Sequence, residues 1–353
     1  MDEHPIPKRE ATTVMFTDIV GSTVSLATLG DHSWREVLTS HDELIRQQLA
    51  RFSGTELDTA NDGFLARFER PGNALLCACA ISDQVREIGI DVRIGLHADE
   101  SAPRSGDLAF VFLATGSRVS SLADAGEVLV SSSMAAMLSE PSIQLESRGM
   151  HVLKGLPGEH ELFEASWHEA PRPDKSPLAS VATTSTDPRA RSKRSVLTLM
   201  FTDISGATRM ASRLGPEAWR QIRGDHDALI ECEVSRADGE IVDAAGDRFF
   251  ATFQLPAEAL SCASAFRDGA RSMGLTVRIG LHVGEVEDMG HKVGGMAIHV
   301  GARVLSLAGP DEILVSSTLR DLVEGAGLDF EEKGQHDMKG VPGSRTVYVM
   351  TIP

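Results

Sequence analysis

A short segment near the start of the chain returns in its second half. The sequence VMFTDIVGST at positions 14–23 recurs as LMFTDISGAT at positions 199–208. In each copy an apolar run of β character ends at an acidic residue, Asp18 or Asp203, and a glycine turn leads into an amphipathic stretch. A carboxylate at a strand end supplies hard oxygen ligands, and the free N–H groups of a following helix start favour anions. The pattern predicts a metal and phosphate site, although an Asp beside a turn is also ordinary turn chemistry.

The repeat extends over most of the chain in one ungapped register. The following residues have a counterpart of the same type 185 positions later: Asp18, Trp34, His41, Asp62, Cys77, His97, Arg118 and Lys154. A constant offset of this length indicates duplication of a whole domain. The sequence therefore predicts one domain at 10–168, a linker at 169–194 and a second domain at 195–353.

The linker reads EAPRPDKSPLASVATTSTDPRARSKR, which is rich in Pro, Ser, Thr and charge and nearly lacks large apolar residues. This composition cannot supply a core and predicts a mobile connection. As a random coil of about 26 residues it would span about 25 to 30 Å. That reach would let the two domains pack face to face.

The net charge, the cysteines and the lack of long apolar runs argue against several classes of function. The formal net charge of -17 argues against a surface for nucleic acid or for an anionic membrane, although metal ions can still bring a nucleotide to an acidic protein. We interpret the cysteines as reduced core residues: Cys77, Cys79, Cys232 and Cys262. The start MDEHPIPKRE has no apolar segment of a signal peptide, and no apolar run approaches the length of a membrane span. We expect a cytoplasmic protein.

The predicted elements alternate between strands and helices. In the first copy a strand ends at Asp18 and a helix follows to about Phe52. The later elements are a hairpin at 56–68, a helix at 72–88, a strand at 92–97, a helix at 110–123, a strand at 127–133 and a closing hairpin around the KGLPG turn. Helices interspersed with hairpins predict an α+β fold, with a mixed sheet packed with helices in each domain.

Together these motifs resemble the catalytic domain of class III nucleotidyl cyclases, the adenylate and guanylate cyclases. The resemblance covers nearly all of both copies and is carried by FTDIVGST, NDGFLARF, VRIGLH, GSRV and GARV, EVLVS and EILVS, and LKGLPG and MKGVPG. It implies a ferredoxin-like βαββαβ core. It also implies that two domains pair head to tail and build each active site across their interface, so that a tandem chain is an intramolecular pseudo-heterodimer. A homodimer of two chains is the other arrangement.

The resemblance implies a reaction and its residues. The ribose 3′ hydroxyl of a nucleoside triphosphate attacks the α-phosphate and pyrophosphate leaves, with two Mg2+ or Mn2+ ions as cofactors. The implied metal ligands are Asp18, Asp62, Asp203 and Asp247. The implied transition-state cations are Arg118 and Arg303, and the implied triphosphate contacts are Lys154 and Lys339.

The positions that would read the base and the ribose depart from the family pattern. Adenylate-forming members have a base-selecting Lys and Asp and a transition-state Asn there. These positions hold Asp58, Asp107 and Ala114 in the first copy and Asp243, Lys292 and His299 in the second. The two composite sites are therefore unequal.

One composite site would join Asp203 and Asp247 to the first-copy set, where two carboxylates face one base and an alanine cannot bond the ribose. This site is expected to be degenerate. The other would join Asp18 and Asp62 to the second-copy set with Arg303 and Lys339. Here a polar His can stand in for the Asn, so we expect this site to be the competent one.

The base-reading pair of that site suggests a substrate. Guanine offers N–H donors that the Asp243 carboxylate can accept and an O6 acceptor that Lys292 can serve, so the pair fits guanine better than adenine. The alternative is that Asp243 and Lys292 form an ion pair with each other across the base pocket.

Two functions remain open from the sequence. The first is a metal-dependent nucleotidyl cyclase, a lyase that makes a cyclic nucleotide for intracellular signalling. The second is an inactive cyclase-like module that binds nucleotide and signals to a partner. His97 and His282 are interpreted as structural histidines, and Trp34 and Trp219 as residues that pack in the core or between domains.

Overall fold

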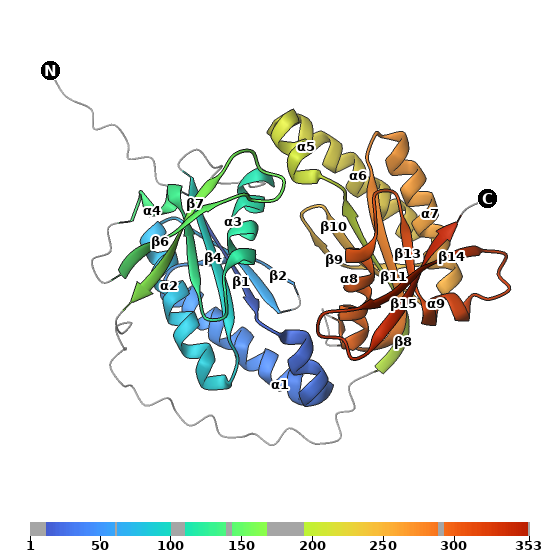
Figure 1. The fold of residues 1–353 in the computed structure, drawn as a ribbon, viewed down its shortest axis with the longest axis horizontal. Helices are drawn as coiled ribbons and strands as arrows, with labels where there is room; N and C mark the ends of the chain where they lie inside the picture. The colour runs from blue at the N-terminus through green and yellow to red at the C-terminus, as the bar shows by residue number, and fades with distance from the viewer. Residues whose placement is uncertain are drawn as a thin grey trace. The chain divides into compact units, whose positions relative to one another are not determined.

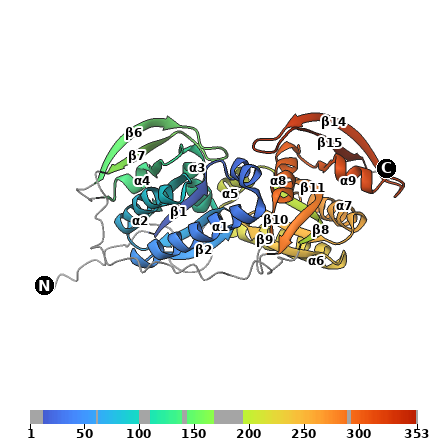
Figure 2. The same ribbon diagram turned by 90° about the horizontal axis from the view of Figure 1, so that it is seen from below.

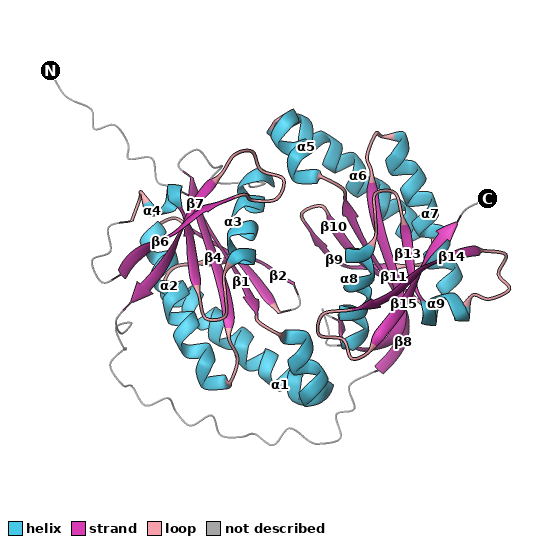
Figure 3. Ribbon diagram, in the orientation of Figure 1, coloured by secondary structure: helices cyan, strands magenta, loops and turns pink. Residues whose placement is uncertain are grey.

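The chain folds into two compact units, each a sheet packed with helices (Figures 1 and 3). The computed structural model describes residues 12–60, 62–99, 110–138, 143–167, 194–288 and 293–351. The first unit consists of the first repeat without 21–35 but with 211–216, and the second unit consists of the second repeat without 211–216 but with 21–35. The predicted linker, except its last residue Arg194, and the predicted site residues Asp107 and Lys292 lie outside the described residues.

The sheet of the first unit has seven strands in the order β2-β3-β1-β4-β5-β7-β6. Its central strand β1 (Thr12–Ile19) pairs antiparallel with β3 (Gly63–Phe68) and with β4 (Val92–Asp99). The remaining strands are β2 (Thr55–Ala60), β5 (Val128–Ser131), β6 (Ile143–His151) and β7 (His160–Trp167). The order β2-β3-β1-β4 is that of a βαββαβ core, which confirms the predicted fold class.

The helices of the first repeat are α1 (Ser22–Arg51), α2 (Pro71–Gln84), the 3-10 helix η1 (Val85–Ile88), α3 (Phe110–Leu122) and α4 (Ser132–Ala135). The strand predicted at 127–133 is shorter in the structure, because the hydroxyl of Ser131 accepts a hydrogen bond from the N–H of Met134 and starts α4. An N-cap of this kind satisfies a backbone donor that a continuing strand would leave unpaired.

A glycine interrupts the first helix of both repeats at the same repeat position. Gly30 inside α1 has a φ of 76° and a ψ of 164°, which is not helical. Its counterpart Gly215 has a φ of 81° and separates α5 (Ala207–Leu214) from α6 (Pro216–Arg236). Positive φ strains residues that carry a Cβ, so glycine allows the chain to turn here.

The second unit repeats the same sheet with one additional short strand. The order is β14-β15-β13-β11-β8-β10-β9, and β12 pairs with β11. The strands are β8 (Arg194–Ile204), β9 (Glu240–Ala245), β10 (Arg248–Phe253), β11 (Val277–Asp288), β12 (Val293–Gly294), β13 (Ile313–Ser316), β14 (Asp329–Asp337) and β15 (Ser344–Thr351). The further helices are α7 (Pro256–Ser272), α8 (Met296–Leu307) and α9 (Ser317–Leu322). Figure 2 shows the long hairpin of β14 and β15, in red, alongside α8 and α9.

A glycine allows α3 and α8 to lie directly on their sheets. A Cβ at Gly116 of α3 would come within 2.8 Å of the Phe16 ring of β1, and a Cβ at Gly301 of α8 within 2.5 Å of the Phe201 ring of β8. Real side chains do not approach so closely, so both helices sit where only glycine fits. This contact fixes the helices that carry Arg118 and Arg303.

The buried residues confirm most of the predicted core. Trp34 and Trp219 are buried, and so are three of the four cysteines: Cys77, Cys79 and Cys262. Burial raises the pKa of the Cys77 thiol to about 12, which keeps it protonated and unreactive. The prediction is wrong for Cys232, which is exposed on α6. Among the described helices, none combines the length and the apolar character that crossing a membrane requires.

Candidate functional site

The two acidic residues of the first repeat meet at one edge of its sheet. Asp18 lies near the end of β1 and pairs in register with Gly63, the first residue of β3. Asp62 precedes Gly63 in the turn between β2 and β3. The antiparallel pairing therefore brings two carboxylates that are distant in sequence to neighbouring positions. The second repeat has the same arrangement, with Asp203 in register with Arg248, which follows Asp247.

Asp18 forms an ion pair with an arginine that sequence reasoning missed. Arg93 on β4 is its register partner on the other side of β1, and the Nε of Arg93 donates to Oδ2 of Asp18 at 2.8 Å. The Nη2 of Arg93 donates to the same oxygen. The Asp18 side chain remains 33% exposed, so the carboxylate stays open to solvent.

Asp203 is enclosed by two arginines. Its register partner Arg278 on β11 donates from Nη2 to Oδ2, and the Nε of Arg248 lies 3.6 Å from Oδ1. The Asp203 side chain is 8% exposed. The signal for Arg93 and Arg278 was present in the sequence, since both follow the valine of the repeated VRIG motif, but pairing across strands is a tertiary relationship.

Arg118 and Lys154, the predicted cations of the first repeat, come together. The Nε of Arg118 on α3 donates to the backbone oxygen of Lys154 at 3.4 Å. An apolar cluster joins the helix to the loop that carries Lys154, and its members are Val119, Ala123, Leu129, Leu153, Leu156 and Leu162. The helix that carries Arg118 and the loop that carries Lys154 are therefore packed against each other.

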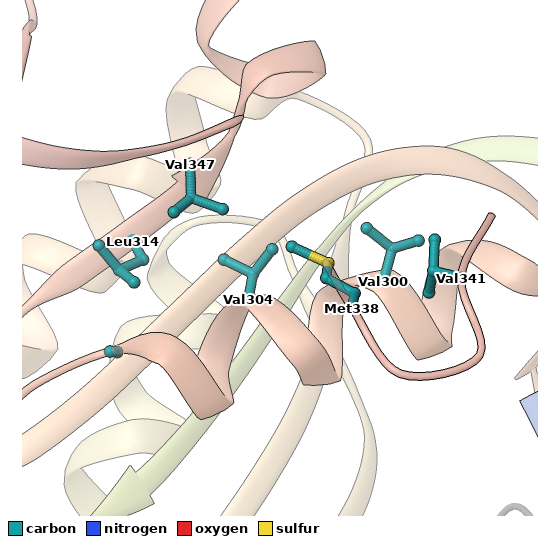
Figure 4. Packing of buried hydrophobic residues seen from close by; sticks show 7 residues of the cluster. Val300, Val304, Leu314, Met338, Val341 and Val347 are labelled. Carbon is teal, nitrogen blue, oxygen red and sulfur yellow. The ribbon is translucent and has the colours of Figure 1, made fainter. Parts of the chain in front are cut away.

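In the second repeat, apolar packing likewise joins the helix that carries Arg303 to the loop that carries Lys339 (Figure 4). Val300 and Val304 of α8 flank Arg303 in sequence, and Met338 and Val341 flank Lys339. These four apolar side chains pack in one buried cluster, which Figure 4 shows between the helix and the loop. The packing of these four residues thus fixes the backbone positions from which the Arg303 and Lys339 side chains extend.

His299 contacts the first turn of α1, the helix that follows Asp18. Within the second unit, its Nδ1 lies 3.1 Å from the hydroxyl oxygen of Thr23, which is buried. Burial lowers the pKa of His299, and the charge of Arg303 lowers it further, so the imidazole is favoured in its neutral form. Gly340, next to Lys339, also approaches Thr23, because a Cβ on it would lie 2.5 Å from the Cβ of Thr23.

The predicted base-reading residues lie on corresponding strands. Asp58 on β2 pairs in register with Leu65, and Asp243 on β9 pairs with Phe250. Both aspartates adjoin an irregularity in their strand pairing, and both are partly buried. A β-bulge re-aims side chains near functional sites. Ala114 lies on α3, four residues before Arg118.

His97 and His282 have the structural role that the sequence predicted. The Nδ1 of His97 lies 2.9 Å from the hydroxyl of Ser131, and that of His282 lies 2.8 Å from the hydroxyl of Ser316. Burial lowers the pKa of each to about 4, so both are neutral at physiological pH. Each imidazole joins its own strand to the start of a short helix.

The acidic pair of the first repeat fits a divalent cation that a substrate helps to hold. Among the described residues, no group of three or more His, Cys, Asp or Glu side chains is arranged to hold a metal ion alone. Mg2+ is commonly bound by one or two carboxylates together with water and substrate phosphates, and this needs no such group. Asp18 and Asp62 provide two carboxylates at one sheet edge, and Asp18 is open to solvent.

Comparison with known proteins finds a matching family model and several relatives in sequence. Residues 190–351 match the sequence model of the family described as the adenylate and guanylate cyclase catalytic domain. The chain is 29% identical over 154 residues to an adenylate cyclase of Podospora anserina, covering 35% of this chain and 7% of the relative. It is 31% identical over 125 residues to the serine/threonine-protein kinase pkn2 of Myxococcus xanthus, covering 33% of this chain and 15% of the relative.

A solved structure was also similar. The adenylyl cyclase CyaB from P. aeruginosa aligns with a TM-score of 0.44 and 21% identity, covering 46% of this chain and 96% of that structure. The chain spans between 7% and 38% of the length of the curated relatives it matches.

Proposed function

Because the chain belongs to the adenylate and guanylate cyclase catalytic domain family, through residues 190–351 and their repeat in the first half, we propose that it is a tandem nucleotidyl cyclase. It converts a nucleoside triphosphate to a 3′,5′-cyclic nucleotide and pyrophosphate. The reaction takes place at one composite site. That site combines Asp18 and Asp62 of the first repeat with Asp243, Lys292, His299, Arg303 and Lys339 of the second.

The hydrogen bond between Thr23 and His299 carries this proposal. Thr23 stands five residues after Asp18 in the first repeat, and His299 belongs to the second. Segment 21–35, which starts at the Asp18 turn, belongs to the second unit. This contact supports a site to which both repeats contribute, and an intramolecular pairing of the repeats.

Two ion pairs support the same placement of segment 21–35. Within the second unit, Arg35 forms an ion pair with Glu287, which is buried, and Asp31 lies 3.6 Å from Arg194. The repeat counterparts of Asp31 and Glu287 are Pro216 and Ala102, which cannot form these pairs. The contacts therefore favour a pairing in which segment 21–35 of the first repeat contacts the second repeat, since the equivalent contacts with the repeats exchanged could not form.

The residues of the site have distinct roles in the reaction. A divalent cation on Asp18 and Asp62 would supply Lewis-acid activation of the 3′ hydroxyl and charge neutralisation at the phosphates. Arg303 stabilises the charge that develops on the α-phosphate, and Lys339 binds the triphosphate. Packing of their apolar neighbours holds together the two backbone segments that carry Arg303 and Lys339.

His299 orients the ribose. A Thr23 hydroxyl that donates to Nδ1 leaves the proton of the neutral ring on Nε2, and Nε2 can then donate to a substrate oxygen. The lowered pKa of His299 keeps a second proton off the ring at neutral pH. An imidazole can thus perform the hydrogen bonding for which family members use an Asn.

The base of the substrate is guanine in this proposal. Asp243 accepts from the N–H donors of guanine and Lys292 donates to its O6 atom. Adenine would leave these groups unpaired, at about 1 to 3 kcal/mol for each. Equal or tighter binding of ATP than of GTP would exclude this part of the proposal and favour an ion pair between Asp243 and Lys292.

The second candidate is an inactive module that binds nucleotide and signals to a partner. The altered base-reading positions and the replacement of the Asn in both repeats favour it. The presence of both carboxylates, Arg303 and Lys339 favours the enzyme.

Product formation distinguishes the two candidates. The purified chain is incubated with Mn2+ or Mg2+ and each of the four ribonucleoside triphosphates, beside Asp18→Ala and the matched variant Asp203→Ala. We expect cyclic product from the wild type and from Asp203→Ala, and its loss in Asp18→Ala. Nucleotide binding without turnover of any triphosphate would establish the inactive module instead.

A further inference from the structure

The two acidic pairs differ at one residue that the strand register places against them. The residue paired with Asp18 across the sheet is Gly63, and the residue paired with Asp203 is Arg248. On the other side, each aspartate is in register with an arginine in both repeats: Arg93 of β4 for Asp18 and Arg278 of β11 for Asp203. Arg248 is therefore an additional cation of the second repeat.

The additional cation changes what the carboxylate can bind. Both hydrogen bonds from Arg93 go to one oxygen of Asp18, whereas the two oxygens of Asp203 face different guanidinium groups. The Asp18 side chain is 33% exposed and that of Asp203 is 8% exposed. A divalent ion needs an accessible oxygen lone pair and a local surplus of negative charge. Asp203 offers less of both.

We propose that Arg248 excludes divalent cations from Asp203 and Asp247, so that Asp18 and Asp62 form the one acidic pair of the chain that binds Mg2+ or Mn2+. This inference deepens the proposed function and rests on it, because it gives a reason within the second repeat why only one composite site is expected to be active. It also departs from the family pattern, in which both aspartates are metal ligands.

Arg248 acts by charge more than by a tight bond. Its side chain is 64% exposed, and an exposed ion pair at 3.6 Å is weak by itself. Nevertheless it keeps a second positive charge beside Asp203, in addition to Arg278. A divalent cation that approaches Asp203 is repelled by two guanidinium groups, those of Arg248 and Arg278. Of the two residues in register with Asp18, only Arg93 carries a positive charge.

Direct binding of Mn2+ tests this inference without reference to activity. Free Mn2+ is measured by electron paramagnetic resonance during titration of the full chain. The variants are Asp18→Asn, Asp203→Asn, Arg248→Gly and Gly63→Arg, in which the last two exchange the residues of the repeats. Thermal unfolding of each variant identifies any that fail to fold.

We expect one class of Mn2+ sites in the wild type. Its affinity for Mn2+ should fall at least tenfold in Asp18→Asn and in Gly63→Arg and should be unchanged in Asp203→Asn. Arg248→Gly should add a second class, which Asp203→Asn added to that variant removes. Two classes in the wild type, one of them lost in Asp203→Asn, would overturn the inference, as would an unchanged stoichiometry in Arg248→Gly. Failure of the chain to form cyclic product would refute the proposed function but leave these binding results interpretable.

Discussion

The hydroxyl oxygen of Thr23 lies 3.1 Å from Nδ1 of His299, although 276 positions separate the two residues in sequence. If this contact orients His299 toward the ribose, Thr23→Val should lower kcat by about 3- to 10-fold, the effect of losing one hydrogen bond. Thr23→Ser keeps the hydroxyl and should keep most of the activity. Steady-state kinetics of product formation measure both.

The matched control is the repeat counterpart Thr208→Val, which removes the hydroxyl at the equivalent position of the second repeat. We expect it to change kcat less than Thr23→Val does. Equal losses in the two valine variants would mean that the contact of Thr23 with His299 has no special role in the reaction.

The sequence was sufficient to predict the fold, because both repeats carry the same motifs in one register, and the strand register places the predicted acidic residues of each repeat at neighbouring positions. It could not reveal that Arg93 and Arg248 lie beside Asp18 and Asp203. Strand pairing decides which residues become neighbours, and the pairing partners are distant in the chain. The break in α1 at Gly30 was also missed, because a single glycine within an amphipathic pattern does not by itself predict a positive φ.

The placement of segment 21–35 within the second unit should depend on the ion pair of Arg35 with Glu287. Glu287 is almost fully buried, and breaking a buried ion pair costs about 3 kcal/mol. We therefore expect Glu287→Gln to destabilise the chain by about that amount and to reduce product formation. Denaturant unfolding and the activity assay provide the two measurements.

Glu285 is the control for that substitution. It lies two residues earlier on β11, is 58% exposed and pairs with Arg194 at 3.6 Å. Glu285→Gln should cost less than about 1 kcal/mol, as expected for an exposed pair. If both glutamine variants unfold alike, the buried pair does not hold segment 21–35.

Acid should destabilise the protein through His97 and His282. Burial lowers the folded-state pKa of each to about 4, below the ordinary value of about 6.5. Their stabilising effect is therefore complete above pH 6.5 and is lost as the pH falls from about 6.5 to about 4, at up to about 3 kcal/mol for each. Urea midpoints measured across this range check the loss.

The substitution His282→Gln tests the assignment, since Gln can still bond the Ser316 hydroxyl but does not titrate. The variant should lose stability less steeply between pH 6.5 and pH 4 than the wild type. An unchanged slope would assign the acid sensitivity to other groups.

Gly301 should be intolerant of even a methyl group, because α8 rests on the Phe201 ring at this position. A Cβ there would lie 2.5 Å from the ring, so Gly301→Ala should destabilise the second unit by about 1 to 3 kcal/mol. The displacement of α8 should also lower kcat, since the same helix carries His299 and Arg303.

The control is Gly224→Ala in α6, where a Cβ would meet nothing within 4 Å, and alanine should stabilise the helix by up to about 1 kcal/mol. Thermal unfolding and kinetics of the two variants separate the effects. A Gly301→Ala protein as stable and active as Gly224→Ala would show that the close approach of α8 to the sheet does not position the site.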